Sequence, residues 1–177
     1  MDDFVRELLD VLGEDVWQYG VLTSDQVSFD EGVRHACEQN YCGRYGKCWT
    51  CPPGVGDYEK LRDGLLVYKN VFVFTTKHAL EDSFDIEGMN EAHIIHDAAT
   101  KKIFPLCKER GAKLLGAGGC TICEKCTYPD SPCRFPEKAI SSVEANGINV
   151  MQLSKTAGIN YINGANTVTY FSVVFYN

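Results

Sequence analysis

The arrangement of its cysteines constrains this chain more than any other sequence feature. The nine cysteines form two groups of four, with Cys107 alone between them. The first group lies within "CEQNYCGRYGKCWTC" and the second within "CTICEKCTYPDSPC". The start of the chain lacks the basic segment and apolar block of a signal peptide, so we expect a cytoplasmic protein. Thiols stay reduced in that compartment, so clustered cysteines are more typical of metal binding or catalysis than of disulfides.

The second group has the more specific spacing. It consists of Cys120, Cys123, Cys126 and Cys133. A Cys-x-x-Cys-x-x-Cys run lets one tight loop turn three sulfurs inward, as ferredoxin loops do at three corners of a 4Fe-4S cluster. Zinc sites more often use two Cys-x-x-Cys pairs separated by a dozen or more residues. The spacing therefore favours a 4Fe-4S cluster over zinc, with Cys133 as the nearest candidate for the fourth corner.

The first group is spaced more loosely and leaves the metal open. It consists of Cys37, Cys42, Cys48 and Cys51, the last followed by two prolines. Proline directly after a ligating cysteine is typical of ferredoxins, but this spacing suits zinc equally well. One or two clusters are compatible with the pattern, because the last cysteine of either run can serve the other cluster.

Three readings of function follow from these ligands. The first is a 4Fe-4S protein that passes single electrons to a redox protein or enzyme partner. The second is an enzyme, such as a desulfidase or small reductase, in which a cluster with only three cysteine ligands leaves one iron open to substrate. The third is a binding module stabilised by zinc.

Two quoted stretches carry a family resemblance. "CEQNYCGRYGKCWTCPPG" and "GAGGCTICEKCTYPDSPCRFPEKAISSVEANGINV" resemble a family of predicted metal-binding, cysteine-rich proteins of unknown function, found mainly in anaerobic bacteria and archaea. The resemblance spans nearly the whole chain, and "CRFPE" is its most specific part. It implies metal binding by seven cysteines, namely Cys37, Cys42, Cys51, Cys120, Cys123, Cys126 and Cys133. Cys48 lies outside that pattern.

Composition excludes several classes of protein. The chain has 177 residues, 45% of them hydrophobic, which fits a single metal-binding domain over residues 1–177. A net charge of −7 has the wrong sign for binding nucleic acid. No apolar run approaches the roughly 20 residues that cross a bilayer, so we expect no membrane partner.

The fold class expected is α/β, in the mixed α+β sense, with a small mixed sheet flanked by helices and two cysteine-rich loops. Helices are predicted at the acidic N-terminus, at 57–66 and 90–110, and at 150–157 before Gly158. "NVFVFTT" and "AKLLGAGG" read as strands, the second leading into the second cysteine loop. Pro136 is expected to start a helix, and Asn163-Gly164 to form a hairpin turn before a long final strand.

Other polar and aromatic residues have simpler explanations. His93 and His96 lie three apart on a predicted helix, a spacing that could bind metal but is more often satisfied within the core. Cys107 is expected to be a small buried residue. The aromatic residues near the cysteine loops are expected to exclude water from the metal. They are Tyr41, Tyr45, Trp49 and Tyr128.

Overall fold

The structure is a computed structural model that describes residues 2–177, and its centre is a four-stranded antiparallel sheet. The strands follow the order β1-β2-β4-β3. Their bounds are β1 Gln18–Thr23, β2 Asn70–Ala79, β3 Lys113–Leu115 and β4 Thr167–Tyr176. The two long central strands pair over their whole length, from Asn70 with Tyr176 to Ala79 with Thr167.

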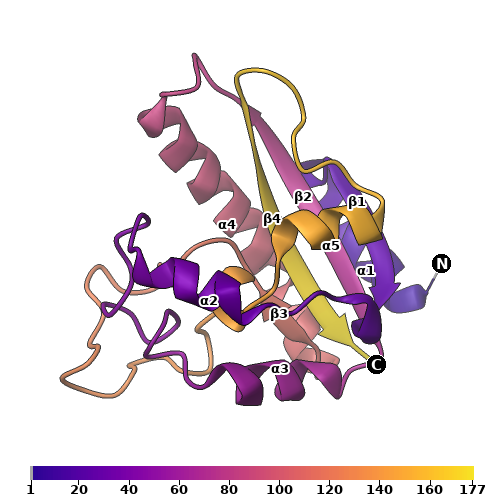
Figure 1. The fold of residues 1–177 in the computed structure, drawn as a ribbon. Helices are drawn as coiled ribbons and strands as arrows, with labels where there is room; N and C mark the ends of the chain where they lie inside the picture. The colour runs from indigo at the N-terminus through magenta and orange to yellow at the C-terminus, as the bar shows by residue number, and fades with distance from the viewer. Residues whose placement is uncertain (1) are drawn as a thin grey trace.

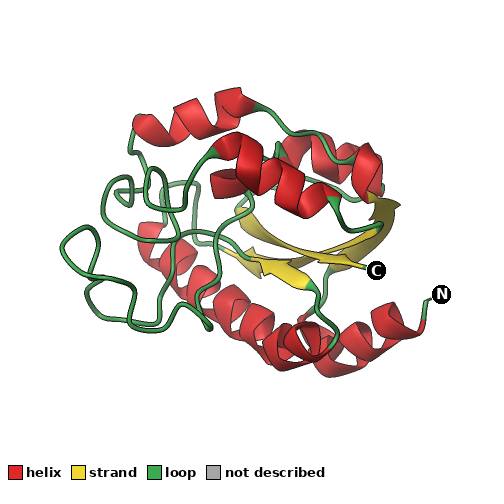
Figure 2. Cartoon of the chain, turned by 90° about the horizontal axis from the view of Figure 1, so that it is seen from below, coloured by secondary structure: helices red, strands yellow, loops and turns green. Residues whose placement is uncertain are grey.

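Helices cover both faces of this sheet, as Figure 2 shows from below. One face carries α1 (Asp3–Leu12) and α4 (Ile86–Glu109). The other carries α3 (Tyr58–Leu66) and α5 (Val150–Ala157). The α2 helix (Glu31–Glu38) has no buried residue and lies beside a short 3-10 helix, Glu144–Asn146. The α+β class and the flanking helices predicted from the sequence are confirmed.

Alternation along the central strands explains why both faces are apolar. In β2, Val71 and Val73 pack on the side of α3 and α5, while Phe72 and Phe74 pack on the side of α1 and α4. Successive side chains of a strand point to opposite faces, so a continuous apolar run fills two cores at once. The sheet is therefore a rigid support for the loops at its end.

Several predicted elements are confirmed and two predictions are wrong. The helix at 150–157 ends at Gly158, and α4 runs through Pro105 to Glu109. No helix starts at Pro136, because Ser141 and Val143 exchange backbone hydrogen bonds with Gly116 instead. The tail is not a hairpin either, because β4 pairs with β2 and β3 and the residues before it form no strand.

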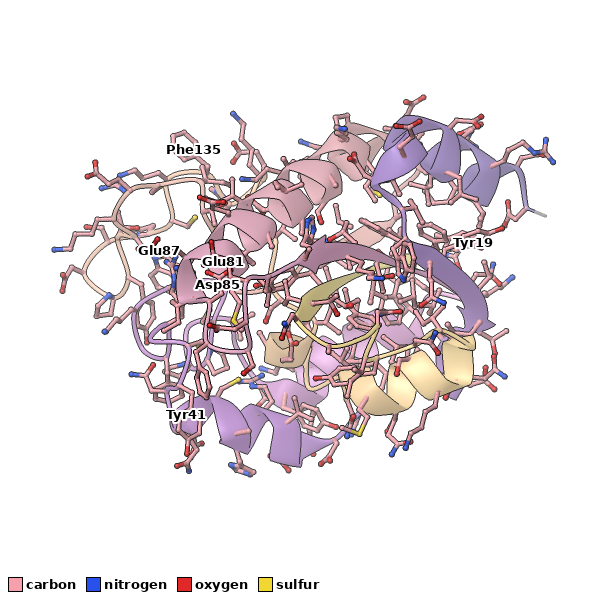
Figure 3. The ribbon with its side chains drawn as sticks, turned by 90° about the horizontal axis from the view of Figure 1, so that it is seen from above. Tyr19, Tyr41, Glu81, Asp85, Glu87 and Phe135 are labelled. Atoms are coloured by element: carbon pink, nitrogen blue, oxygen red, sulfur yellow. The ribbon has the colours of Figure 1, made fainter. Side chains whose placement is uncertain are left out.

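The two cysteine loops leave the sheet at the same end of the molecule. Figure 1 shows the chain after α2 and the chain after β3 projecting together on the side away from both termini. In Figure 3, Tyr41 and Phe135 mark this end, and Tyr19 lies at the opposite one. The cysteines of both groups are thus gathered on one side of the fold.

His96 anchors α4 to the sheet through a buried polar contact. Its side chain is fully buried, with Nδ1 2.9 Å from Thr76 Oγ1 and Nε2 2.8 Å from Ser172 Oγ. Burial, with a smaller contribution from the nearby His93, lowers the pKa of His96 to about 3. His96 is thus a neutral core histidine, in agreement with the interpretation that we favoured over a metal pair.

We expect His96 to make the protein less stable in acid. As the pH falls below the ordinary histidine pKa of about 6.5, His96 takes up a proton in the unfolded chain but stays neutral in the folded protein. The free energy of unfolding should therefore fall by about 1.4 kcal/mol per pH unit between about pH 6.5 and 3. When the free energy of unfolding is measured with denaturant at several pH values, it should change less steeply with pH in His96→Gln than in the wild type. The exposed His35 provides a control, and His35→Gln should keep the wild-type slope.

Candidate metal centre

Each cysteine loop is held at its base by regular structure. Cys37 lies in the last turn of α2, whose N-cap Asp30 accepts a hydrogen bond from the Gly32 amide. The second loop leaves β3 and returns where Gly116 bonds to Ser141 and Val143. This confirms that a strand leads into the second loop. Because α2 is only eight residues long, its apolar stripe is limited to Val33, Ala36 and Cys37, too few residues for a helix to be recognised.

The two loops are joined by contacts between residues far apart in the sequence. Thr50 Oγ1 accepts a hydrogen bond of 3.0 Å from the Cys120 amide. Trp49 Nε1 donates to the Ser131 carbonyl at 3.0 Å, and its ring meets the Tyr128 ring edge-on at 4.8 Å. The first loop therefore forms one wall of the site that the second loop builds.

Two glycines allow this close approach. A Cβ atom added to Gly54 would lie 2.7 Å from the Tyr128 ring and 2.8 Å from the Cys48 carbonyl oxygen. A Cβ atom on Gly119 would lie 3.1 Å from Cys51 Sγ. A side chain at Gly54 would push the loops apart, and one at Gly119 would displace the Cys51 sulfur, so both positions need glycine.

A pocket at the junction brings together thiols from both loops. We call it the five-thiol pocket; its cysteines are Cys48, Cys120, Cys123, Cys126 and Cys133. None of the described residues that line it is His, Asp or Glu, whereas Arg44 and Arg134 are present. The pocket thus presents soft sulfur donors beside two cations, a combination suited to an anionic metal–thiolate centre.

The remaining cysteines of the first group line a neighbouring cavity. This three-thiol cavity has a volume of about 330 Å³ and contains Cys37, Cys42 and Cys51. The eight clustered cysteines are therefore divided five and three in space, although they are divided four and four along the chain. Cys48 belongs to the first group in the sequence but lines the pocket of the second group, and no feature of its local spacing indicates this.

Cys48 and Cys51 connect the two cavities. A hydrogen bond between their side chains lowers the pKa of Cys48 and raises the pKa of Cys51. Thr50 Oγ1 lies 3.1 Å from Cys48 Sγ and, because it already accepts from Cys120, can donate its own proton to that sulfur. Cys48 is thus favoured as the thiolate of the pair.

Burial is the main cause of the pKa shifts of Cys37, Cys107 and Cys120. Burial raises the pKa of Cys120, and burial together with the charge of Cys42 raises the pKa of Cys37. Metal binding at these residues must therefore displace protons. Burial raises the pKa of Cys107 to about 12 within the core under α4, as expected for a thiol used only for packing.

Thr50 is a site residue that the sequence reasoning missed. It is buried, with 6% of its surface exposed, and contacts both a sulfur and the second loop. Its position between Cys48 and Cys51 is the only local signal that could have drawn attention to it. A hydroxyl beside two thiols is otherwise too common to indicate a function.

The thiols are not packed tightly around a single point. Among residues 2–177, no three His, Cys, Asp or Glu side chains are arranged to hold one metal ion. Sulfurs bound to one zinc ion lie about 3.8 Å apart, as follows from a Zn–S distance of about 2.3 Å. The described ligand residues of the five-thiol pocket are all cysteines, a donor set that is typical of iron–sulfur sites.

Comparison with known proteins supports a metal site. A family model described as "Predicted metal-binding protein (DUF2284)" matches residues 20–176. The chain belongs to this family of predicted metal-binding proteins. The match covers all nine cysteines of the chain and confirms the resemblance to a family of predicted metal-binding proteins. No curated protein and no solved structure matches the chain.

The helices were also compared with the requirements of a membrane span. Within residues 2–177, none is both long enough and apolar enough to cross a bilayer.

Proposed function

We propose that the protein binds a 4Fe-4S cluster in the five-thiol pocket. Cys120, Cys123 and Cys126 supply three corners, and Cys133 supplies the fourth. The observation that carries the proposal is the convergence of these four thiols, with Cys48 beside them, on one pocket free of oxygen and imidazole ligands among its described lining residues. Such a donor set is typical of iron–sulfur sites.

The surroundings of the pocket support a role in electron transfer. A 4Fe-4S cluster takes up and releases single electrons, and its potential depends on nearby charge, hydrogen bonds and solvent access. Arg44 and Arg134 line the pocket, and positive charge there favours the reduced, more negative state. Because the loops project from the fold, a redox protein or enzyme partner can approach them. We therefore propose one-electron transfer to such a partner.

A zinc-stabilised module is the competing proposal. Zinc needs four donors at tetrahedral spacing around one ion, and no such group is formed among residues 2–177. The Cys-x-x-Cys-x-x-Cys spacing of Cys120, Cys123 and Cys126 supports a cluster more than zinc. The remaining function proposed from the sequence, an enzyme with an open iron, depends on the three-thiol cavity and is taken up below.

Metal analysis of anaerobically purified protein tests the proposal. We expect iron and acid-labile sulfide in equal amounts, visible absorption that bleaches on reduction, and an electron paramagnetic resonance signal from the reduced protein. A colourless protein with stoichiometric zinc would contradict cluster binding. Cys48→Ala should keep its iron, since Cys133 supplies the fourth corner, and Cys133→Ala should lose it. If Cys48→Ala loses the cluster and Cys133→Ala keeps it, Cys48 supplies the fourth corner instead.

A further inference from the structure

The three-thiol cavity differs from the five-thiol pocket in what it offers a metal. Cys37, Cys42 and Cys51 supply three sulfurs, one fewer than the corners of a 4Fe-4S cluster. Cys48, the nearest further thiol, lines the other pocket. Three thiols facing an open volume are what a centre with one exchangeable position requires.

A carboxyl group also lines the three-thiol cavity. Glu144 is the only acidic residue among the described residues lining the cavity. Solvent reaches its side chain, but protein surrounds it on the other sides, and this burial raises its pKa. Cys37 and Glu144 line the same cavity, and the charge of Glu144 raises the pKa of Cys37. In its ionised form, Glu144 adds negative charge to the cavity.

A partly buried cation, Arg34, lies on the same helix as Cys37. Arg34 precedes Cys37 by three residues on α2, which places both on one side of that helix. Its Nη2 donates to the Gly56 carbonyl at 2.8 Å, whereas Nε and Nη1 are buried and find no hydrogen-bond partner among residues 2–177. The positive charge of Arg34 also lowers the pKa of Cys37. A guanidinium kept buried in this way offsets the negative charge of a metal–thiolate centre.

The shape and walls of the cavity restrict the ligand. A volume of about 330 Å³ lies at the small end of ligand pockets. Val33, Ala36 and Tyr45 give it largely apolar walls, and Tyr41, 94% exposed, stands at its edge. Thiolates and Glu144 repel anions, so the cavity suits a small uncharged molecule. A sulfur donor is the match for iron already bound by thiolates.

We propose that Cys37, Cys42 and Cys51 hold a second 4Fe-4S cluster whose open position faces this cavity and binds a small neutral thiol. The proposal rests on the iron–sulfur function proposed above and adds a ligand site to it. Binding forms a bond from the thiol sulfur to the open position, and the proton of the S–H bond passes to water. The contact between Cys48 and Cys51 places the two centres side by side.

Iron content separates this inference from the proposed function. Cys42→Ala should lose roughly half of the iron and sulfide and keep the resonance signal of the five-thiol pocket. If Cys42→Ala keeps all its iron while Cys126→Ala loses all of it, the second cluster is overturned and the proposed function stands. If the wild type binds no iron, the proposed function itself fails.

Two thiol probes test the ligand class. Addition of 2-mercaptoethanol should shift one of the two resonance signals of the reduced wild-type protein, and the anionic 3-mercaptopropionate should need about a tenfold higher concentration for the same shift. Glu144→Gln should reduce the ratio between the concentrations of the two thiols that give the same shift. Glu14→Gln, at an exposed position on the first 3-10 helix, should leave that ratio unchanged. Equal responses to both probes in the wild type, or no response to either, would overturn the neutral-thiol site.

Discussion

Cys126→Ala should lose the cluster of the five-thiol pocket while the sheet stays folded. Cys126 is the third cysteine of the tight run, and no other described thiol outside the pocket can replace it without moving the loop. We expect the iron content to fall by roughly half or more, together with the visible absorption and the corresponding resonance signal. Iron and sulfide analysis of anaerobically prepared protein measures this directly.

Cys107→Ala is the matched control for that variant. Cys107 is 1% exposed and packs among apolar residues between α4 and the sheet. Its replacement removes one sulfur from the core and should cost about 1 kcal/mol of stability, with iron content unchanged. Equal loss of iron in both variants would show that general destabilisation, and not a missing ligand, removes the metal.

Gly54→Ala should separate the two cysteine loops. The added Cβ would meet the Tyr128 ring at 2.7 Å and the Cys48 carbonyl oxygen at 2.8 Å, and the second of these is backbone that cannot rotate away. Overpacking of this kind costs about 1–3 kcal/mol. Since the loops unite the thiols of the five-thiol pocket, we expect at least a severalfold loss in iron retained after gel filtration.

Gly64→Ala provides the comparison for Gly54→Ala. Gly64 lies in the last turn of α3, and a Cβ there meets nothing within 4 Å. Alanine is favoured over glycine in a helix by up to about 1 kcal/mol, so this variant should melt at the same or a higher temperature and keep its iron. A Gly54→Ala protein that retains iron as firmly as Gly64→Ala would show that close docking of the loops is unnecessary.

The regular elements were predictable where the pattern was local. The N-terminal helix, the buried strand at "NVFVFTT" and the helix before Gly158 follow from periodicity and capping, and the structure contains all three. The predicted helix at Pro136 failed because Ser141 and Val143 bond to Gly116, which lies more than 20 residues earlier. The α2 helix was missed because it is short and contributes no residue to either apolar core.

The sequence by itself determined that the chain belongs to a family of predicted metal-binding proteins, because ligand chemistry depends on residue type and close spacing. Cys-x-x-Cys-x-x-Cys in a loop rich in glycine and proline points to a metal whatever the fold around it. Only the tertiary structure decided how the thiols are divided between the five-thiol pocket and the three-thiol cavity. Cys48 and Cys51 are three residues apart, yet they line different cavities, because Thr50 between them is bound to Cys120. That contact joins positions 70 residues apart in the chain, a distance at which cysteine spacing carries no information.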